Sequence, residues 1–170
     1  MATSTPYPQT MTPTKKVYPS KTVTPTRTQT PAGEVQLTPT ATPPTTPCPH
    51  SNYYWKKHSD DWPVWSLTLG SQSYTKRELL FLLYLRVYNP SIALAQELIA
   101  AKLNITNGAD PDSILPVIAS ADMVLSSFDG KLPYHVEWSS DIGKTMLGLA
   151  YTLDSYNDGK LTEGCSYHNY

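Results

Sequence analysis

The chain has 170 residues, 16 of them Pro and only two of them Cys, and its formal net charge is −1. Neither this charge nor its distribution along the chain suggests the clustered basic face that binds nucleic acid. No apolar run approaches the roughly 18 residues that span a membrane, so we expect neither a nucleic-acid partner nor a membrane span.

Residues 1–47 are predicted to form an extended arm. They hold 15 Thr and 10 Pro and hardly any large aliphatic side chains, so they cannot bury enough apolar surface to fold alone. Pro favours extended polyproline II, and Thr with Pro is typical of O-glycosylated stalks. Three interpretations stay open: a glycosylated spacer, an unmodified disordered linker, and a segment that docks on a neighbouring subunit.

Cys48 and Cys165 bracket every Trp and Phe of the chain. A lone pair at the two edges of a domain predicts a disulfide, which would place the protein in an oxidising compartment. The N-terminus carries no apolar signal segment, which conflicts with that location. We therefore expect an extracellular or cell-surface protein whose export signal is absent from this chain. The alternative is a cytosolic protein with two buried free thiols. Residues 48–165 suffice for one domain, and residues 166–170 are predicted to be a C-terminal tail.

The first part of this domain, residues 53–74, is rich in aromatic side chains. Its apolar spacing fits neither a helix nor a strand, so an irregular segment that packs across the helices is predicted. Large aromatic side chains dominate core burial, which assigns Trp55, Trp62 and Trp65 to the core.

A small hairpin is expected from residues 66–69 and 72–74. Directly after it, Thr75 and Glu78 have the spacing of a capping box that opens a helix through residues 79–87. That segment is apolar on nearly every side, so we expect this helix to be central.

Two further helices are marked by their first residues. Asn89 and Pro90 supply an N-cap and a Pro at the first helical position. In the next helix Pro116 fits only within the first turn, which makes Asp112 or Ser113 the expected cap. Helical spacing places one apolar set on each helix: Ile92, Ala95, Ile99 and Leu103, then Ile114, Ile118, Ala121 and Leu125.

A fourth helix begins after Ser139 or Ser140 and ends at residues 157–159, where Asn-Asp-Gly stops it. Its apolar face consists of Ile142, Met146, Leu149 and Leu153. The sequence therefore predicts a mainly α, small four-helix domain, closed by one disulfide and preceded by the arm.

Several short motifs spread over residues 48–165 occur together. They are Cys48-x5-Tyr54-Trp55-Lys56-x-His58, Trp62-Pro63-Val64, Leu67-Thr68-Leu69-Gly70, Leu98-Ile99-Ala100-Ala101-Lys102-Leu103-Asn104, Asn107-Gly108-Ala109-Asp110-Pro111, Leu153-Asp154-x-Tyr156-Asn157 and Gly164-Cys165. This combination resembles a module of secreted and cell-surface proteins of bacteria that has no established activity. The resemblance implies the location and the limits of the domain. The chain departs from it at Tyr53, where the module has Gly.

Five neighbouring side chains are the candidate binding residues: Tyr53, Tyr54, Lys56, Lys57 and His58. Exposed aromatic rings stack on sugars or on partner proteins, and the basic groups beside them supply hydrogen-bond donors. The alternative is that the aromatic side chains of this segment only fill the core.

His58 stands near Asp60 and Asp61, which could act as a base with its orienting carboxylates. No nucleophile motif accompanies them, so no catalytic residue is assigned and we expect neither an enzyme nor a cofactor. A His that hydrogen-bonds within a turn is the commoner case.

Residues 154–162 resemble part of a calcium loop, with Asp154 and Asp158 as the ligands at its first and fifth positions. Tyr156 and Cys165 stand where two further ligands are needed. No metal site is therefore assigned, and calcium binding by Asp154 and Asp158 stays a weak alternative to a simple helix end.

These features together predict a secreted or cell-surface structural or adhesive module that contacts a protein partner or assembles with itself. The alternative is a module that binds carbohydrate or protein through exposed aromatic side chains, and an enzyme centred on His58 is less favoured. An exposed aromatic platform would favour binding, and a large apolar patch would favour assembly. A pocket at His58 with converging carboxylates would favour an enzyme.

Overall fold

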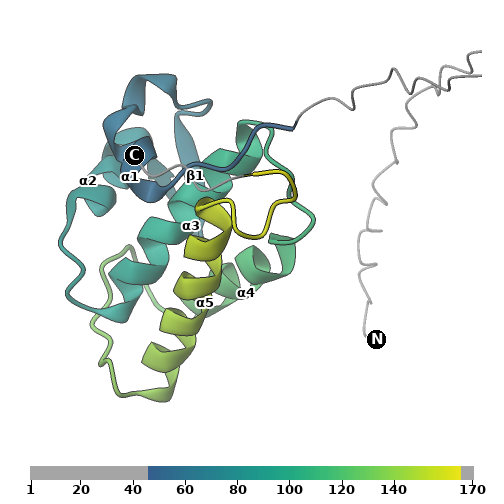
Figure 1. The fold of residues 1–170 in the computed structure, drawn as a ribbon. Helices are drawn as coiled ribbons and strands as arrows, with labels where there is room; N and C mark the ends of the chain where they lie inside the picture. The colour runs from purple at the N-terminus through teal and green to yellow at the C-terminus, as the bar shows by residue number, and fades with distance from the viewer. Residues whose placement is uncertain (1–45, 166–170) are drawn as a thin grey trace, which may run out of the picture. The chain divides into compact units, whose positions relative to one another are not determined.

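The structure is a computed structural model that describes residues 46–165. Most of the predicted arm (1–45) and the predicted tail (166–170) therefore lie outside the described residues. Within residues 46–165 the chain forms five α-helices, one 3-10 helix and one two-stranded sheet (Figure 1). The prediction of a mainly helical domain is confirmed. The expected number of four helices is too low, because a short helix precedes the hairpin.

The centre of the domain is α3 (Pro90–Thr106), which packs along α5 (Asp141–Asn157) (Figure 1). Apolar side chains cover α3 on nearly every side, and Leu94, Leu98 and Leu103 are fully buried. The prediction that the preceding helix is central is wrong. That helix, α2 (Lys76–Tyr84), ends before residue 85 and exposes side chains on its outer face.

Most helix starts are where local sequence placed them. The Thr75 hydroxyl and the Glu78 carboxylate form the predicted capping box of α2. Asn89 caps α3, and Ser140 caps α5 by accepting from the N–H of Gly143. The cap predicted for α4 (Leu115–Ser126) is wrong, because this helix starts after Ile114 without a side-chain cap.

The turn before α4 explains why this helix has no side-chain cap. There the Asp110 carboxylate accepts from the N–H of Asp112 (3.0 Å), which folds residues 110–112 into a local turn. The N–H groups of Ile114 and Leu115 then donate to the carbonyl of Pro111 (3.0 Å each). Backbone groups thus stabilise the approach to the helix where a side-chain cap was expected.

The segment predicted to be irregular contains α1 (Asn52–Lys57), capped by Ser51, and η1 (Ser59–Asp61). The predicted hairpin is confirmed as β1 (Ser66–Leu69) and β2 (Gln72–Thr75), which pair antiparallel. Gly70 in its turn has φ +61°, and a Cβ there would lie 2.9 Å from Leu125 of α4. Only Gly therefore lets the hairpin approach α4 this closely.

The three Trp residues of this segment lie in different environments. Trp55 and Trp62 are buried as predicted, and the Trp62 indole donates to the carbonyl of Trp55 (2.8 Å). The prediction for Trp65 is wrong, because 81% of this residue is exposed. Trp65 precedes β1, and its carbonyl accepts from the N–H of Lys76 (2.7 Å). Its side chain therefore stands beyond the packed part of the hairpin.

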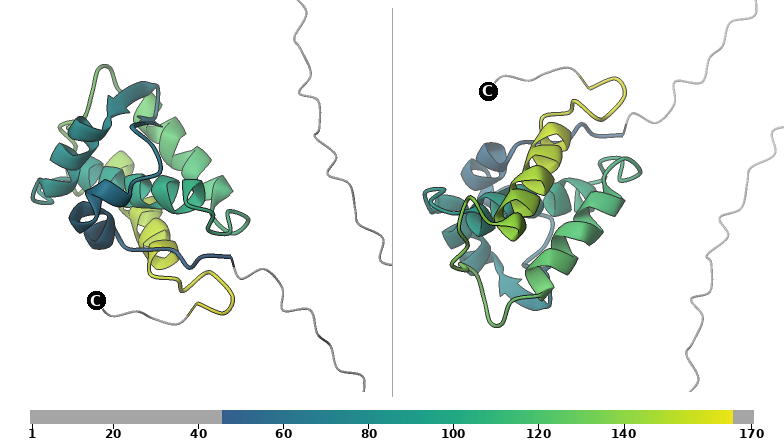
Figure 2. Two further views of the ribbon diagram at one scale, coloured as in Figure 1. Left: turned by 90° about the horizontal axis from the view of Figure 1, so that it is seen from above. Right: turned by 90° about the horizontal axis from the view of Figure 1, so that it is seen from below.

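The predicted disulfide is confirmed. Cys48 and Cys165 are bonded across a sequence separation of 117, with their Cα atoms 5.6 Å apart. Gly159, with φ +76°, follows α5 and turns the chain back toward Cys165. The two ends of the described chain consequently run side by side (Figure 2).

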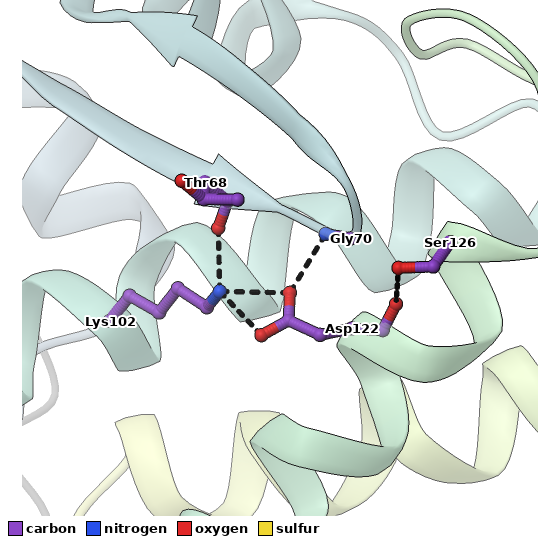
Figure 3. A network of polar contacts seen from close by, with 5 residues as sticks. All are labelled: Thr68, Gly70, Lys102, Asp122 and Ser126. Atoms are coloured by element: carbon purple, nitrogen blue, oxygen red, sulfur yellow. Dashed lines mark hydrogen bonds and ion pairs between the residues drawn. The ribbon is translucent and has the colours of Figure 1, made fainter. Parts of the chain in front are cut away.

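A second cross-link is polar and ties the hairpin to α3 and α4 (Figure 3). The Lys102 ammonium of α3 contacts both carboxylate oxygens of Asp122 (2.8 and 2.6 Å) and donates to the carbonyl of Thr68 (2.6 Å). The same carboxylate accepts from the N–H of Gly70 (2.8 Å), and the Asp122 carbonyl accepts from Ser126 (2.7 Å). Because every one of these groups has a partner inside the domain, the cluster stabilises the fold.

Candidate functional site

A hollow beside the exposed indole of Trp65 has the residues of a ligand site. Its volume is about 500 Å³, and it lies between η1, the hairpin and the first turns of α2. The lining combines one aromatic platform, one aliphatic side chain and several polar groups: Ser59, Asp60, Trp65, Thr75, Lys76, Arg77 and Leu80. We refer to these seven residues as the Trp65 pocket.

Lys76 is held beside the platform. Its ammonium lies 4.9 Å from the centroid of the Trp65 ring and 5.9 Å from that of Trp62. These contacts are cation–π interactions, which leave the hydrogen-bonding capacity of the ammonium free. Across residues 46–165, neither Lys76 nor Arg77 takes part in an ion pair. Both cations are thus available at the edge of the pocket.

The Thr75 hydroxyl of the pocket is already used. It donates to the Glu78 carboxylate (2.9 Å) and accepts from the Glu78 N–H (3.4 Å). The N–H of Thr75 donates to the same carboxylate (2.8 Å). Glu78 also meets Lys131 at 2.6 Å, and these contacts, led by that with Lys131, lower the pKa of Glu78 to about 2. The helix end is therefore closed by its own residues, and a ligand would meet side chains.

A second aromatic cluster lies toward the other end of α2. The ammonium of Lys56 stands 5.4 Å from the ring centroid of Tyr53 and 5.6 Å from that of Tyr84. The Tyr84 hydroxyl contacts the carbonyl of Lys56 (3.4 Å), and Lys57 also lies over Tyr53 (5.7 Å). Phe81, which is exposed, lies between Arg77 and Tyr84 on the outer stripe of α2.

The predicted binding residues therefore separate into two groups. Tyr53, Lys56 and Lys57 lie together at the surface, joined by the unpredicted Tyr84. Tyr54 instead stacks between two His rings, with centroid distances of 3.9 Å to His50 and 4.2 Å to His58. Both faces of its ring are occupied, so Tyr54 does not offer a platform for a ligand.

His58 lies at the exposed end of α1, where its Nδ1 contacts the carbonyl of Tyr54 (2.9 Å). Within the described chain it forms no ion pair with Asp60 or Asp61. It is also not among the residues that line the Trp65 pocket. The arrangement of base and orienting carboxylate considered from the sequence is not found at this position.

The segment that resembled a calcium loop has a different geometry. Asp154 lies within α5, and Asp158 follows as its C-cap and pairs with Lys160 (3.0 Å). Burial, followed by the charge of Asp158, raises the pKa of Asp154. Among the described residues, no group of three or more His, Cys, Asp or Glu side chains is arranged to hold a metal ion.

A buried polar network that was not predicted from the sequence centres on Asn104 of α3. Its carboxamide accepts from the N–H of His50 (2.8 Å) and the Trp55 indole (2.9 Å), and donates to the His50 carbonyl (2.8 Å) and to Asn157 (3.0 Å). Asn157 in turn donates to the carboxylate of Glu97 (3.0 Å). The network joins the segment after Cys48 to α1, α3 and α5, and it stabilises the fold.

Glu97 is the one ionisable member of this network. Asn52 and Asn157 donate to its two carboxylate oxygens. Burial nevertheless raises its pKa to about 7, and the nearby charge of Asp154 adds to this effect. A pocket of about 310 Å³ lies beside it, lined also by Asp154 and Tyr151. Because both Glu97 oxygens are engaged, the Trp65 pocket is the stronger candidate for a ligand site.

Comparison with known proteins gives no match: no family model matches the chain, and no curated protein or solved structure is significantly similar to it. Over residues 46–165, no helix combines the length and the apolar character needed to cross a membrane.

Most of the Trp65 pocket was not predicted from the sequence, although one signal was present. Lys76 and Arg77 directly follow the N-cap Thr75, so they occupy the first two positions of α2. Cations are unfavourable at the positive end of a helix. A residue type that lowers helix stability at its own position is an indicator of a functional site.

Proposed function

We propose that the chain is an adhesive module of an extracellular or cell-surface protein, and that it binds carbohydrate at the Trp65 pocket. The observation that carries this proposal is the 81% exposure of Trp65 beside a hollow lined by polar groups. Trp62, three residues earlier, is only 8% exposed. A Trp that serves only packing is buried, as Trp62 is, whereas Trp65 is exposed.

The chemistry of the pocket suits a sugar. The apolar face of a pyranose ring packs against an indole, and its hydroxyl groups need donors and acceptors around the edge of the ring. Lys76 and Arg77 supply donors, Asp60 supplies an acceptor, and Ser59 can serve as either. A purely apolar partner would leave these charged groups without partners, which disfavours it.

The location is proposed from three features. The Cys48–Cys165 disulfide is typical of oxidising compartments. The Thr/Pro composition of residues 1–47 suits a spacer that holds a domain away from its anchor. The resemblance to a bacterial cell-surface module points to the same place.

Self-assembly is the second candidate. It is favoured by the exposure of Leu115 and Met123, two large apolar side chains on α4. Neither of these two side chains lines the Trp65 pocket. Catalysis at His58 is not proposed, because its Nδ1 contacts the Tyr54 carbonyl and, within residues 46–165, it forms no ion pair with a carboxylate.

The test is a glycan array followed by calorimetric titration of the full chain with each glycan that binds. We expect Trp65→Ala to abolish binding. The matched control is Trp138→Ala, which removes another exposed Trp that does not line the pocket and should leave the affinity unchanged. Equal losses in the two variants, or no binding to any glycan, would contradict the proposal. Regular oligomers in electron microscopy without glycan binding would favour assembly.

A further inference from the structure

The cations of the domain are divided by location. Residues 48–165 carry nine basic and thirteen acidic side chains. Four of the nine cations pair with carboxylates: Lys102, Lys131, Lys144 and Lys160. The other five have no ion pair within the described chain: Lys56, Lys57, Lys76, Arg77 and Arg86. All five lie on α1, on α2 or directly after α2.

Four of the cations without an ion pair therefore lie on α1 and α2, which contact each other. Two of the five, Lys76 and Arg77, line the Trp65 pocket. The carboxylates of this region are Asp60 and Asp61 in η1, together with Glu78. Glu78 is neutralised by Lys131, and Asp60 alone of the three lines the pocket. The local balance of charge therefore favours an anion.

The first positions of α2 strengthen this argument. A cation at each of these positions opposes the helix dipole and lowers the stability of the domain when no ligand is bound. The capping box satisfies the backbone at the same helix end, so the two side chains are not needed to close it. Arg77 forms no ion pair within the described chain, and the Lys76 ammonium contacts only the Trp62 and Trp65 rings there, so their placement puts two cations beside an exposed indole.

We infer that the Trp65 pocket takes an acidic polysaccharide, with a uronate ring against the Trp65 indole and its carboxylate at Arg77 and Lys76. This inference rests on the proposed carbohydrate binding and adds the class of sugar. The guanidinium of Arg77 matches a carboxylate with two parallel N–H donors, and the ammonium of Lys76 adds a third donor. Asp60 accepts from ring hydroxyls, which an anionic sugar still carries.

The experiment uses three uronate polymers, polygalacturonate, alginate and hyaluronate, and the methyl ester of each. The ester keeps the sugar rings and removes the charge, so it isolates the contribution of the carboxylate. Titration of the full chain at low salt should show at least one polymer that binds about tenfold more tightly than its ester, as expected for a charge-assisted contact. High salt should weaken the acid form and leave the ester unchanged.

Two variants locate the contact. Arg77→Gln should weaken binding of the acid form about tenfold and leave the ester within about twofold. Arg86→Gln is the matched control, because Arg86 also has no ion pair within the described chain but does not line the pocket. This variant should change neither the affinity for the acid form nor that for the ester. The thermal midpoint of Arg77→Gln should equal or exceed that of the unmodified protein, because a cation leaves the positive end of α2.

The outcomes are distinguishable. Equal binding of polymer and ester, with binding lost in Trp65→Ala, would overturn the acidic class and keep carbohydrate binding. Binding of neutral glycans alone, with none of the three uronate polymers bound, would also overturn the acidic class and keep carbohydrate binding. Equal losses in Arg77→Gln and Arg86→Gln would show diffuse charge attraction and overturn the site. No glycan bound at all would overturn the proposed function together with the inference.

Discussion

The polar groups around Asn104 and those around Trp65 are arranged in opposite ways. In the Asn104 network the donors and acceptors meet one another, from His50 through Trp55 and Asn157 to Glu97. At the Trp65 pocket the charged groups lie beside an exposed ring and form no ion pair within residues 46–165. Satisfied groups stabilise a fold, and exposed unsatisfied groups are free for a partner.

The same contrast separates the two helices that meet these groups. The central helix α3 is buried on most sides, and its Lys102 is neutralised by Asp122. The peripheral helix α2 buries three Leu side chains on one side and presents Phe81 and Tyr84 outward. Substitutions in the first region should therefore change stability, and substitutions in the second should change binding.

The largest effect on stability is expected from the disulfide. Replacing Cys48 and Cys165 together by Ser should lower the free energy of unfolding by about 4–5 kcal/mol, because a loop of more than one hundred residues is no longer closed in the unfolded chain. Urea unfolding of the double variant and the unmodified protein measures the difference. Two free thiols in native protein by non-reducing mass spectrometry would contradict the bond itself.

Trp62→Ala should have the next largest effect. The substitution leaves a cavity beside Trp55, and the Trp55 carbonyl loses the indole N–H that it accepts (2.8 Å). A buried Trp truncated to Ala typically lowers the free energy of unfolding by about 3–5 kcal/mol. A variant that unfolds at the same urea concentration as the unmodified protein would show that this Trp is not an anchor of the core.

Glu97 makes the network sensitive to pH. Its pKa is about 7 in the folded domain, against 4.5 for an unperturbed Glu, so the folded state resists ionisation. The free energy of unfolding should therefore fall as the pH rises from about 4.5 to about 7, by up to about 3 kcal/mol from this residue, and stay level above that range. Glu97→Gln should remove this decline.

Glu78 provides the matched control for this experiment, because its pKa is shifted in the opposite direction. Lys131 and the Thr75 cap lower the pKa of Glu78 to about 2, so its contribution is present above pH 4.5 and lost as the pH falls toward 2. Glu78→Gln should flatten the acid side of the stability profile and leave the neutral side unchanged. Identical profiles for Glu97→Gln and Glu78→Gln would contradict both assignments.

Features that a short spacing or a lone pair of cysteines marks could be predicted from the sequence. The Thr75–Glu78 capping box, the Asn89 cap and the Cys48–Cys165 pair follow from short spacings or from a lone pair of residues. The cap of α4 was wrong because two local patterns competed, and the turn at Asp110 prevailed over a cap at Asp112 or Ser113. Local spacing does not reveal which of two such patterns forms.

Contacts between distant residues could not be predicted where no lone pair of reactive residues marks them. Asn104 and Asn157 are 53 positions apart, and Glu97 and Asn157 are 60 apart, so no local pattern connects them. The assignment of Trp65 to the core failed for the same reason. Composition indicates that a Trp tends to be buried, but only the packing of the hairpin against α2 leaves this one outside.

Trp65→Ala should have the smallest effect on stability. The side chain is exposed, and the contact it loses within the described chain is the cation–π interaction with Lys76, which is worth about 0.5–1 kcal/mol at an exposed site. Urea unfolding should place this variant within that range of the unmodified protein, in contrast to Trp62→Ala. If Trp65→Ala instead destabilises the protein as strongly as Trp62→Ala, Trp65 must be covered in solution. Either a second copy or a part of the chain outside residues 46–165 would then bury this indole. Only a contact between copies would make the unfolding midpoint depend on protein concentration, so that dependence distinguishes the two.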